Sequence, residues 1–219
     1  MAVQSRYSRV HCLRRSLWQH KLKAGSVVGV LITAFLLLEP PAIADLSEEN
    51  RQYTADLLED WRAGEVVVLL RHLERCDRYD LPCLTDKEGI TSRAIEPGRA
   101  LQEDFSQLGL GNTDIFNSPM LRTAETEAIV FADQGEDRDW LINCHDNLLG
   151  DVMANKRPGR NLALVTHSRC IKRFNEALGY ADESPGYGAA LFFSTADDPK
   201  SLQVLGFLDQ EDWEMALGF

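Results

Sequence analysis

The sequence predicts an α/β protein, specifically a three-layer α/β/α sandwich around a mainly parallel central sheet. Two short apolar runs, at 65–70 and 162–166, are rich in Val and Leu without alternation, which is typical of strands buried on both faces. Segments with helical spacing lie between the strand candidates, and strands that alternate with helices favour parallel pairing. Two further strand candidates, at 188–194 and 202–208, are close enough in sequence to form a hairpin.

The N-terminus has the pattern of a secretory signal. Residues 1–24 hold six basic residues and no acidic one, and the uncharged run 26–38 follows. Ala42-Ile43-Ala44 then supplies the small residues that signal peptidase requires. The pattern predicts a cleaved signal over 1–44 and one domain over 45–219. An uncleaved N-terminal anchor is the alternative, although the run is shorter than the ~20 apolar residues that span a bilayer comfortably.

The domain itself alternates helix and strand signals along its length. Apolar residues at helical spacing over 46–62 are followed by Gly64, which suits a helix with a glycine cap. The remaining predicted elements are helices near 97–108, 120–132, 147–155 and 169–178 and strands near 113–117 and 139–143.

The predicted domain is strongly acidic. The whole chain has 23 Lys and Arg and 34 Asp and Glu. The leader holds 6 of the basic residues and 1 of the acidic ones, so the domain has 17 basic and 33 acidic residues, a net charge of −16. Such a surface repels nucleic acid and anionic membranes, so neither is an expected partner, and we expect no stable membrane contact if the leader is cleaved. Any anion-binding site must therefore be a local basic pocket.

Four cysteines lie in the domain, at Cys76, Cys83, Cys144 and Cys170. An even number in an exported protein predicts two disulfides, for which three connectivities are possible. The loop-like stretch between Cys76 and Cys83 favours a bridge between those two, which would leave Cys144 and Cys170 as the second pair. The spacings lack the close cysteine pairs of Cys₄ zinc sites, so we expect no metal.

The two most apolar strand candidates both lead into histidine. One is followed by Arg71 and His72, and the other is followed by His167. Arg122 lies where a further helix is predicted to begin, after Ser118-Pro119. Because ligands of such sheets bind beyond the carboxyl ends of the strands, we expect these side chains to meet at one edge of the sheet.

This set of residues suits attack on a phosphate monoester. Arg71 and Arg122 would neutralise the phosphate oxygens through planar, permanently charged donors, with His167 as a third donor. His72 would attack phosphorus through a neutral ring nitrogen and form a covalent intermediate that water then cleaves. Nearby cations disfavour imidazolium and so help to keep His72 neutral.

The same motifs resemble those of the histidine phosphatase superfamily, which includes the phosphoglycerate mutases and acid phosphatases. RHLER at 71–75, SPMLRTAET at 118–126 and VTHS at 165–168 stand in the family's order and strand contexts. A closer resemblance is to the exported lipopolysaccharide core heptose-phosphate phosphatases. It rests on VVVLLRHLERCDR, on CLTDKEGIT, on the pair Arg122-Thr123 and on the cysteines Cys144 and Cys170. The resemblance implies a phosphoglycerate mutase-like fold and a phosphorylated sugar of the cell envelope as substrate.

Further site residues follow from branches of that superfamily. Arg75 matches an arginine position of the acid phosphatases, and Arg78 matches a phosphate-contacting position of the mutases; a solvated loop position is the alternative for each. The leaving alcohol needs a carboxylic acid as proton donor. The mutase branch takes it from the loop after a middle strand, which here offers Asp146, with Glu74 as second candidate. Asp146 also suits a helix N-cap.

We therefore expect an exported, periplasmic phosphomonoesterase that uses no cofactor and acts on a small phosphorylated substrate. If the leader is retained, the domain would be membrane-anchored. A phosphomutase of the same superfamily is one alternative, which export argues against because phosphoglycerates are cytosolic. A non-catalytic anion-binding or membrane-anchored module is the other, because the proton donor is not fixed by the sequence. Motifs of P-loop and H-E-x-x-H enzymes are absent.

Overall fold

The computed structural model describes residues 40–47, 51–144, 147–181, 184–198 and 200–218. The predicted signal or anchor lies almost entirely outside these residues, so the boundary at 44/45 stays a prediction. Residues Pro41–Phe219 form one compact unit that contains every element named below. Within the described ranges, no helix is both long and apolar enough to cross a membrane.

The described part is built on a six-stranded sheet in the order β3-β2-β4-β1-β5-β6. The β1, β2, β3 and β4 strands pair in parallel, whereas β5 pairs antiparallel with β1 and with β6. The mainly parallel sheet and the C-terminal hairpin are therefore confirmed. The strands are β1 (Val66–Arg71), β2 (Thr113–Asn117), β3 (Glu136–Asp137), β4 (Asn161–Thr166), β5 (Ala190–Ser194) and β6 (Gln203–Leu208).

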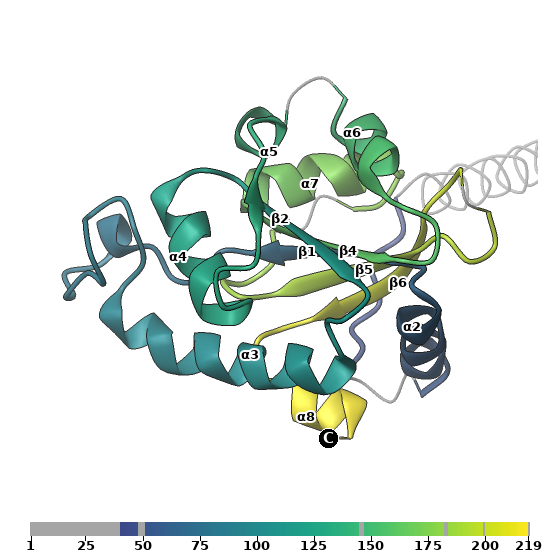
Figure 1. Ribbon diagram of the computed structural model, residues 1–219, viewed down its shortest axis with the longest axis horizontal. Helices are drawn as coiled ribbons and strands as arrows, with labels where there is room; N and C mark the ends of the chain where they lie inside the picture. Colours follow the sequence, from purple (N-terminus) through teal and green to yellow (C-terminus); the bar gives the residue numbers. More distant parts are fainter. Residues whose placement is uncertain (1–39, 48–50, 145–146, 182–183, 199, 219) are drawn as a thin grey trace, which may run out of the picture. The chain divides into compact units, whose positions relative to one another are not determined.

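Helices cover both faces of this sheet, as the three-layer prediction requires. Figure 1 shows α5, α6 and α7 on one side of the strands and α3 and α8 on the other. Buried residues of α2, α3, α4 and α8 share one apolar cluster, and those of α5, α6 and α7 share a second one. The bounds are α2 (Arg51–Ala63), α3 (Ile95–Leu108), α4 (Leu121–Val130), α5 (Trp140–Asn143), α6 (Leu148–Asn155), α7 (Ser168–Ala177) and α8 (Trp213–Leu217).

The β1 strand accounts for the non-alternating apolar run in the sequence. Val66, Val68 and Leu70 belong to one apolar cluster, while Val67 and Leu69 belong to the other. Both faces of the strand are thus covered by helices, and every position between them is apolar. The carboxyl end of this strand is held rigidly where the first predicted histidine follows.

The α2 helix ends as the sequence predicts, at a glycine. Gly64 has a φ of +76°, a conformation that glycine adopts without steric cost. A Cβ atom at this position would also meet the backbone of Gly159, with Gly159 C only 2.3 Å away. Gly64 therefore both ends the helix and allows the close approach of the loop before β4.

The strand predicted at 139–143 is wrong. This segment forms the single-turn helix α5, and the edge strand is β3, at Glu136–Asp137. A short apolar run carries no periodicity that separates helix from strand. The side chains of Glu136 and Asp137 are polar and exposed, so the strand that does pair with β2 carries no apolar signal. The short helix α8 was not predicted.

Both disulfides join the cysteines that the sequence paired. Cys76 is bonded to Cys83 within the segment after β1, with a Cα–Cα distance of 5.3 Å. Cys144, at the end of α5, is bonded to Cys170 in α7, also at 5.3 Å. The predicted connectivity is confirmed.

Candidate active site

The two predicted histidines are brought together by the pairing of β1 with β4. These strands are parallel neighbours, and Arg71 is in register with Thr166 at their carboxyl ends. The backbone N–H of His72 donates to the carbonyl of Thr166 at 3.0 Å. His167 follows directly, and the centroids of the two imidazole rings lie 5.5 Å apart.

Arg122 reaches the same place from the neighbouring strand–helix connection. The β2 strand, on the other side of β4, ends at Asn117, and α4 begins at Leu121. Arg122 thus lies in the first turn of α4, as predicted, with its Nη2 3.0 Å from the sulfur of Met120. Burial lowers the pKa of its guanidinium, and the charge of Arg75 acts in the same direction.

The side chains of His72, His167 and Arg122 line one cavity of ≈ 690 Å³. Its walls include five arginines, and within the described chain no Asp or Glu lines it. Because the domain as a whole is acidic, any anion-binding site was expected to be a local basic pocket, and this cavity has that character. The lining residues are Arg71, His72, Arg75, Arg78, Tyr79, Met120, Arg122, Ile142, His167, Ser168, Arg169, Cys170 and Tyr187.

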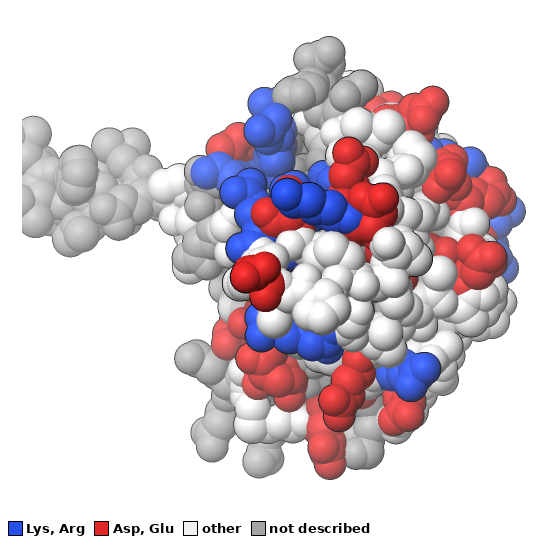
Figure 2. All heavy atoms as spheres, turned by 90° about the vertical axis from the view of Figure 1, so that its left-hand side faces the viewer, with Lys and Arg blue, Asp and Glu red and all other residues white. Residues whose placement is uncertain are grey.

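Figure 2 shows the side of the molecule on which the segment after β1 lies. The largest group of Lys and Arg side chains lies at the upper left of this face, smaller groups lie elsewhere on it, and Asp and Glu side chains are spread over the whole face. The concentration of positive charge favours an anionic ligand and raises its local concentration despite the negative net charge of the chain.

The hydrogen bond of His72 fixes its tautomer. Nδ1 lies 2.7 Å from the carbonyl oxygen of Leu73, which can only accept, so Nδ1 carries the proton. The lone pair of the ring is therefore on Nε2. The ring is almost fully buried, and burial holds its pKa well below 6.5. The hydrogen bond with Leu73 acts in the opposite direction, and the charges of Arg122 and Arg71 lower the pKa further. His72 is consequently neutral at physiological pH.

His167 is oriented by a hydroxyl group. Its Nε2 lies 3.0 Å from Oγ of Ser118, the residue that follows β2. Burial lowers the pKa of His167 to about 4, with contributions from Arg122 and Arg75. When the Ser118 hydroxyl donates to Nε2, the proton of the neutral ring is on Nδ1, which is buried and has no hydrogen-bond partner in the described part of the chain.

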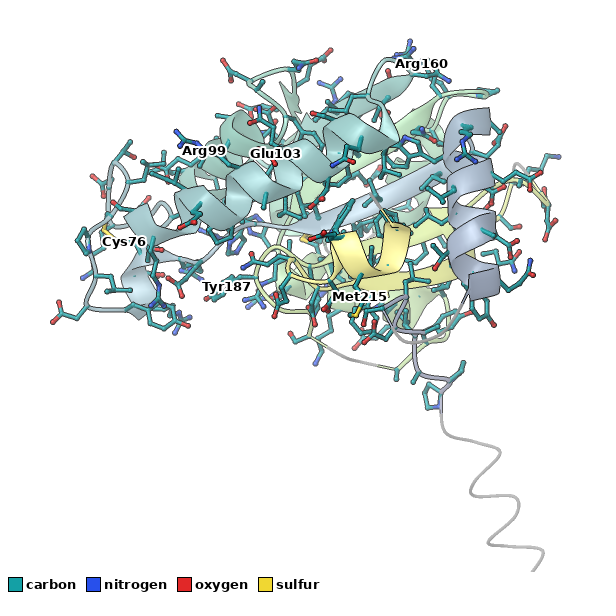
Figure 3. The ribbon with its side chains drawn as sticks, turned by 90° about the horizontal axis from the view of Figure 1, so that it is seen from below. Cys76, Arg99, Glu103, Arg160, Tyr187 and Met215 are labelled. Carbon is teal, nitrogen blue, oxygen red and sulfur yellow. A yellow bond between two sulfur atoms is a disulfide. The ribbon has the colours of Figure 1, made fainter. Side chains whose placement is uncertain are left out.

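Arg71 is held between a carbonyl group and an aromatic ring. Its Nη1 donates to the carbonyl of Pro185, and its guanidinium carbon lies 3.9 Å from the ring centroid of Tyr187. The Tyr187 ring is also 5.7 Å from the ring of His72. In Figure 3 Tyr187 lies in the same half of the view as Cys76, which belongs to the segment after β1. Burial lowers the pKa of Arg71, although the guanidinium remains charged.

Arg75 and Arg78 both line the cavity, at the start and end of a short 3₁₀ segment (Cys76–Arg78). Arg75 is paired with Asp77, with Nε 2.8 Å from Oδ1. Its charge is therefore partly neutralised within the segment itself. The Cys76–Cys83 disulfide closes the loop that carries both arginines.

Of the two predicted proton donors, only Glu74 lies among the described residues. Glu74 lies outside the cavity: Nε of Arg93 is 2.7 Å from its Oε1, and the hydroxyl of Thr91 is 2.8 Å from the same oxygen. These hydrogen bonds, mainly that of Arg93, lower the pKa of Glu74. Glu74 instead lines a separate cavity beyond Tyr187. Asp146 lies outside the described residues. Within the described ranges, no group of three His, Cys, Asp or Glu could hold a metal ion.

Sequence reasoning did not identify Tyr187, Ser118 or Arg169 as site residues. Tyr187 lies far along the chain, between two glycines, and enters the cavity only because β5 pairs with β1. Ser118 precedes the helix of Arg122 and belongs to the SPMLRTAET motif, of which only Arg122 was predicted to contact the ligand. Arg169 is two residues after His167, and its position at the start of a helix was the available signal.

The fold is shared with histidine phosphatases of known structure. The protein histidine phosphatase SixA in complex with tungstate superposes with a TM-score of 0.54 at 16% identity, over 66% of this chain and 97% of that one. A phosphoglycerate mutase from Bacillus anthracis superposes with a TM-score of 0.52 at 12% identity, over 72% and 98%. At these identities the likeness concerns the fold, which confirms the predicted phosphoglycerate mutase-like architecture.

Sequence similarity agrees with the fold and with the paired histidines and arginines. This chain is similar to the lipopolysaccharide core heptose(II)-phosphate phosphatases, as the motifs predicted. It is 29% identical over 135 residues to the protein from Salmonella arizonae, covering 60% of this chain and 67% of that one. It is 33% identical over 125 residues to the protein from Escherichia coli O139:H28, covering 56% and 62%. No protein-family model matches the chain.

Proposed function

We propose that this protein is an exported phosphomonoesterase that forms a transient phosphohistidine on His72. Its substrate is a small phosphorylated molecule, and a sugar phosphate of the cell envelope is the class that the named relatives suggest. Two disulfides support export because such bonds persist in oxidising compartments, and the predicted signal over 1–44 agrees with it.

One observation carries the proposal. The described chain contains seven buried side-chain nitrogen or oxygen atoms without a hydrogen-bond partner, and three of them belong to residues of this one cavity. They are Nε of Arg71, Nε of Arg122 and Nδ1 of His167. A buried polar group without a partner costs free energy, so such groups rarely occur together without a ligand. All three can donate, and a phosphate offers the acceptor oxygens that they lack.

The proposed first step is attack by Nε2 of His72 on phosphorus. The N–P bond forms while the bond between phosphorus and the leaving oxygen breaks, and the alcohol departs with a proton from an acid. Arg71 and Arg122 neutralise the charge on the equatorial oxygens in the transition state, and neutral His167 donates a hydrogen bond to them. In the second step water gives a proton to the carboxylate left by the acid and attacks phosphorus. The N–P bond breaks, which releases inorganic phosphate and regenerates both neutral His72 and the protonated acid.

The proton donor in this proposal is Asp146, on the basis of the sequence. It belongs to the connection between α5 and α6, and Cys144 at the end of α5 is bonded to Cys170, a residue of the cavity wall. Glu74 is the weaker candidate, because a carboxyl group whose pKa is lowered by Arg93 remains ionised and has no proton to give. Arg75 and Arg78 are proposed to extend the phosphate contact toward the leaving group.

The proposal is tested by hydrolysis of p-nitrophenyl phosphate by residues 45–219. We expect His72→Ala to lower kcat by more than about 10³-fold, because the variant lacks the ring nitrogen that would form the N–P bond. Arg122→Ala should lower kcat/KM by about 10²- to 10³-fold through lost charge stabilisation. Arg99→Ala, which removes an exposed arginine of α3 (Figure 3), is the matched control and should be neutral.

Turnover by His72→Ala within tenfold of the unmodified protein would refute the nucleophile. No hydrolysis of any phosphomonoester by the unmodified protein would favour an anion-binding module of the same fold.

A further inference from the structure

A second cavity, of ≈ 970 Å³, adjoins the one that contains His72. The two cavities share Ser168 and Arg169, at the start of α7. The Cys144–Cys170 disulfide lies between them, because Cys144 lines the second cavity and Cys170 lines the first. The two cavities are therefore neighbours around the start of α7.

Positive charge is concentrated on the wall that α7 contributes. Arg169, Lys172 and Arg173 line the second cavity, and a spacing of three and four residues places them on one face of the helix. Glu176 is the one acidic residue among the described lining residues. Since acidic residues outnumber basic ones by 34 to 23 in the whole chain, this wall reverses the general charge balance.

The helix is fixed in the position that presents these cations. Its opposite face packs Ile171 and Phe174 into the apolar core, where both are fully buried. Cys170 adds a covalent bond to the end of α5. The cationic face therefore cannot turn away from the cavity without breaking the core, and it forms a preorganised surface for an anion.

We infer that the second cavity binds another anionic group of the same substrate molecule. The inference rests on the proposed function, since the first phosphate is the one at His72. The substrate class is then a saccharide with at least two anionic groups: one phosphate is hydrolysed, while a second phosphate or a carboxylate is held by Lys172 and Arg173. Arg169, which lines both cavities, links the two sites.

Calorimetric titration of the His72→Ala protein tests this without turnover. The probes are hexyl phosphate, with one anionic group, hexane-1,6-diol bisphosphate, with two phosphates, and 6-(phosphonooxy)hexanoate, with a phosphate and a carboxylate. Nine-carbon homologues allow for a longer reach between the sites. A salt concentration of about 0.15 M, where the Debye length is about 8 Å, suppresses contributions from distant charges.

We expect at least one bisphosphate to bind the His72→Ala protein about tenfold or more tightly than the monophosphate of equal length. Adding Lys172→Gln and Arg173→Gln should remove this preference and leave the Kd of the monophosphate within about twofold. The control Arg62→Gln/Arg99→Gln also removes two positive charges, from exposed positions on α2 and α3, and should keep the preference. A similar gain with the phosphate–carboxylate probe would show that the site accepts carboxylates; a gain only with bisphosphates would identify phosphate.

Equal affinity for mono- and dianionic probes in the His72→Ala protein would overturn this inference alone. Equal loss of the preference in the control variant would also overturn it, because net charge rather than the α7 wall would then be responsible. Failure of every probe to bind, the monophosphate included, would instead contradict the proposed phosphate site at His72.

Discussion

Single hydrogen bonds set the chemistry of the site at the residue scale. The carbonyl of Leu73 places the proton of His72 on Nδ1, and the hydroxyl of Ser118 orients His167. Pro185 and Tyr187 hold the guanidinium of Arg71 from two directions. These four partners come from three different segments, and only the folded chain brings them to one cavity. The nucleophile and the donors are therefore oriented before a ligand arrives.

The identity of the proton donor can be tested with leaving groups of different basicity. Asp146→Asn should lower kcat by about 10²-fold or more for glycerol 2-phosphate, whose alkoxide needs a proton, but much less for p-nitrophenyl phosphate. Glu74→Gln should stay within about threefold for both substrates, because its carboxyl group is held by Arg93. The opposite pattern, with loss of glycerol phosphate activity in Glu74→Gln alone, would assign the acid to Glu74.

The positions of these residues were predictable to different degrees. His72, His167 and Arg122 follow strands or begin a helix, so the sequence pattern located them at one edge of the sheet. Tyr187 could not be located in this way, because its place depends on how the hairpin β5–β6 pairs with β1. The orientation of Glu74 was also not predictable, since it is decided by Arg93, nineteen residues further along the chain.

The segment between β1 and α3 is the element that completes the cavity. It carries Arg75 and Arg78, and it is closed on itself by the Cys76–Cys83 disulfide. It is also attached to α4, because Glu125 accepts hydrogen bonds from the backbone N–H of Ile90, at 2.7 Å, and from the hydroxyl of Thr85. The segment is thus held by the disulfide in its first half and by Glu125 in its second half.

Removal of this bridge should affect stability and binding together. Cys76→Ser/Cys83→Ser is expected to lower the free energy of unfolding by about 2–3 kcal/mol, because the bridge restricts a short loop of the unfolded chain. It should also raise KM for p-nitrophenyl phosphate by about three- to tenfold, since the two arginines lose their preorganised position. Urea denaturation and steady-state kinetics measure the two effects. A stability loss with unchanged KM would mean that Glu125, rather than the bridge, positions the loop.

Long, strongly patterned elements of the fold were predicted well, and short ones were not. The β4 strand is buried at every position and β1 at every position except Arg71, and their apolar runs follow from that burial. The β3 strand has only two residues, both exposed, and depends on backbone pairing with β2. The α5 helix has one turn, so its few apolar residues could not be told from those of a strand. These short elements are decided by tertiary pairing, which a local pattern does not contain.

At the scale of the whole molecule, a local basic site is maintained within an acidic protein. Desolvation and neighbouring arginines keep both histidines neutral, at the cost of stability in acid. In the unfolded chain each histidine would bind a proton near its ordinary pKa of about 6.5, whereas the folded pKa of His167 is about 4. The unfolded state therefore binds more protons between these values, and stability falls as the pH decreases.

This linkage gives a quantitative expectation for His167. Between about pH 8 and pH 5, its contribution should reduce the free energy of unfolding by about 2 kcal/mol. Between these pH values the free energy of unfolding, measured by urea denaturation, should therefore fall by about 2 kcal/mol less in His167→Asn than in the unmodified protein. The difference between the two proteins isolates this residue, because carboxyl groups such as Asp209 contribute equally to both. Parallel pH profiles would show that His167 titrates normally.

The central claim is that phosphate is transferred to Nε2 of His72, and trapping the intermediate tests it most directly. A rapid-mixing experiment with ³²P-labelled substrate, stopped in alkaline detergent because phosphohistidine is labile in acid, measures label on the protein. We predict burst labelling of the unmodified protein, with the phosphoryl group assigned to His72 by mass spectrometry and absent from His72→Ala. Label on another residue, or turnover without label on His72, would contradict the account.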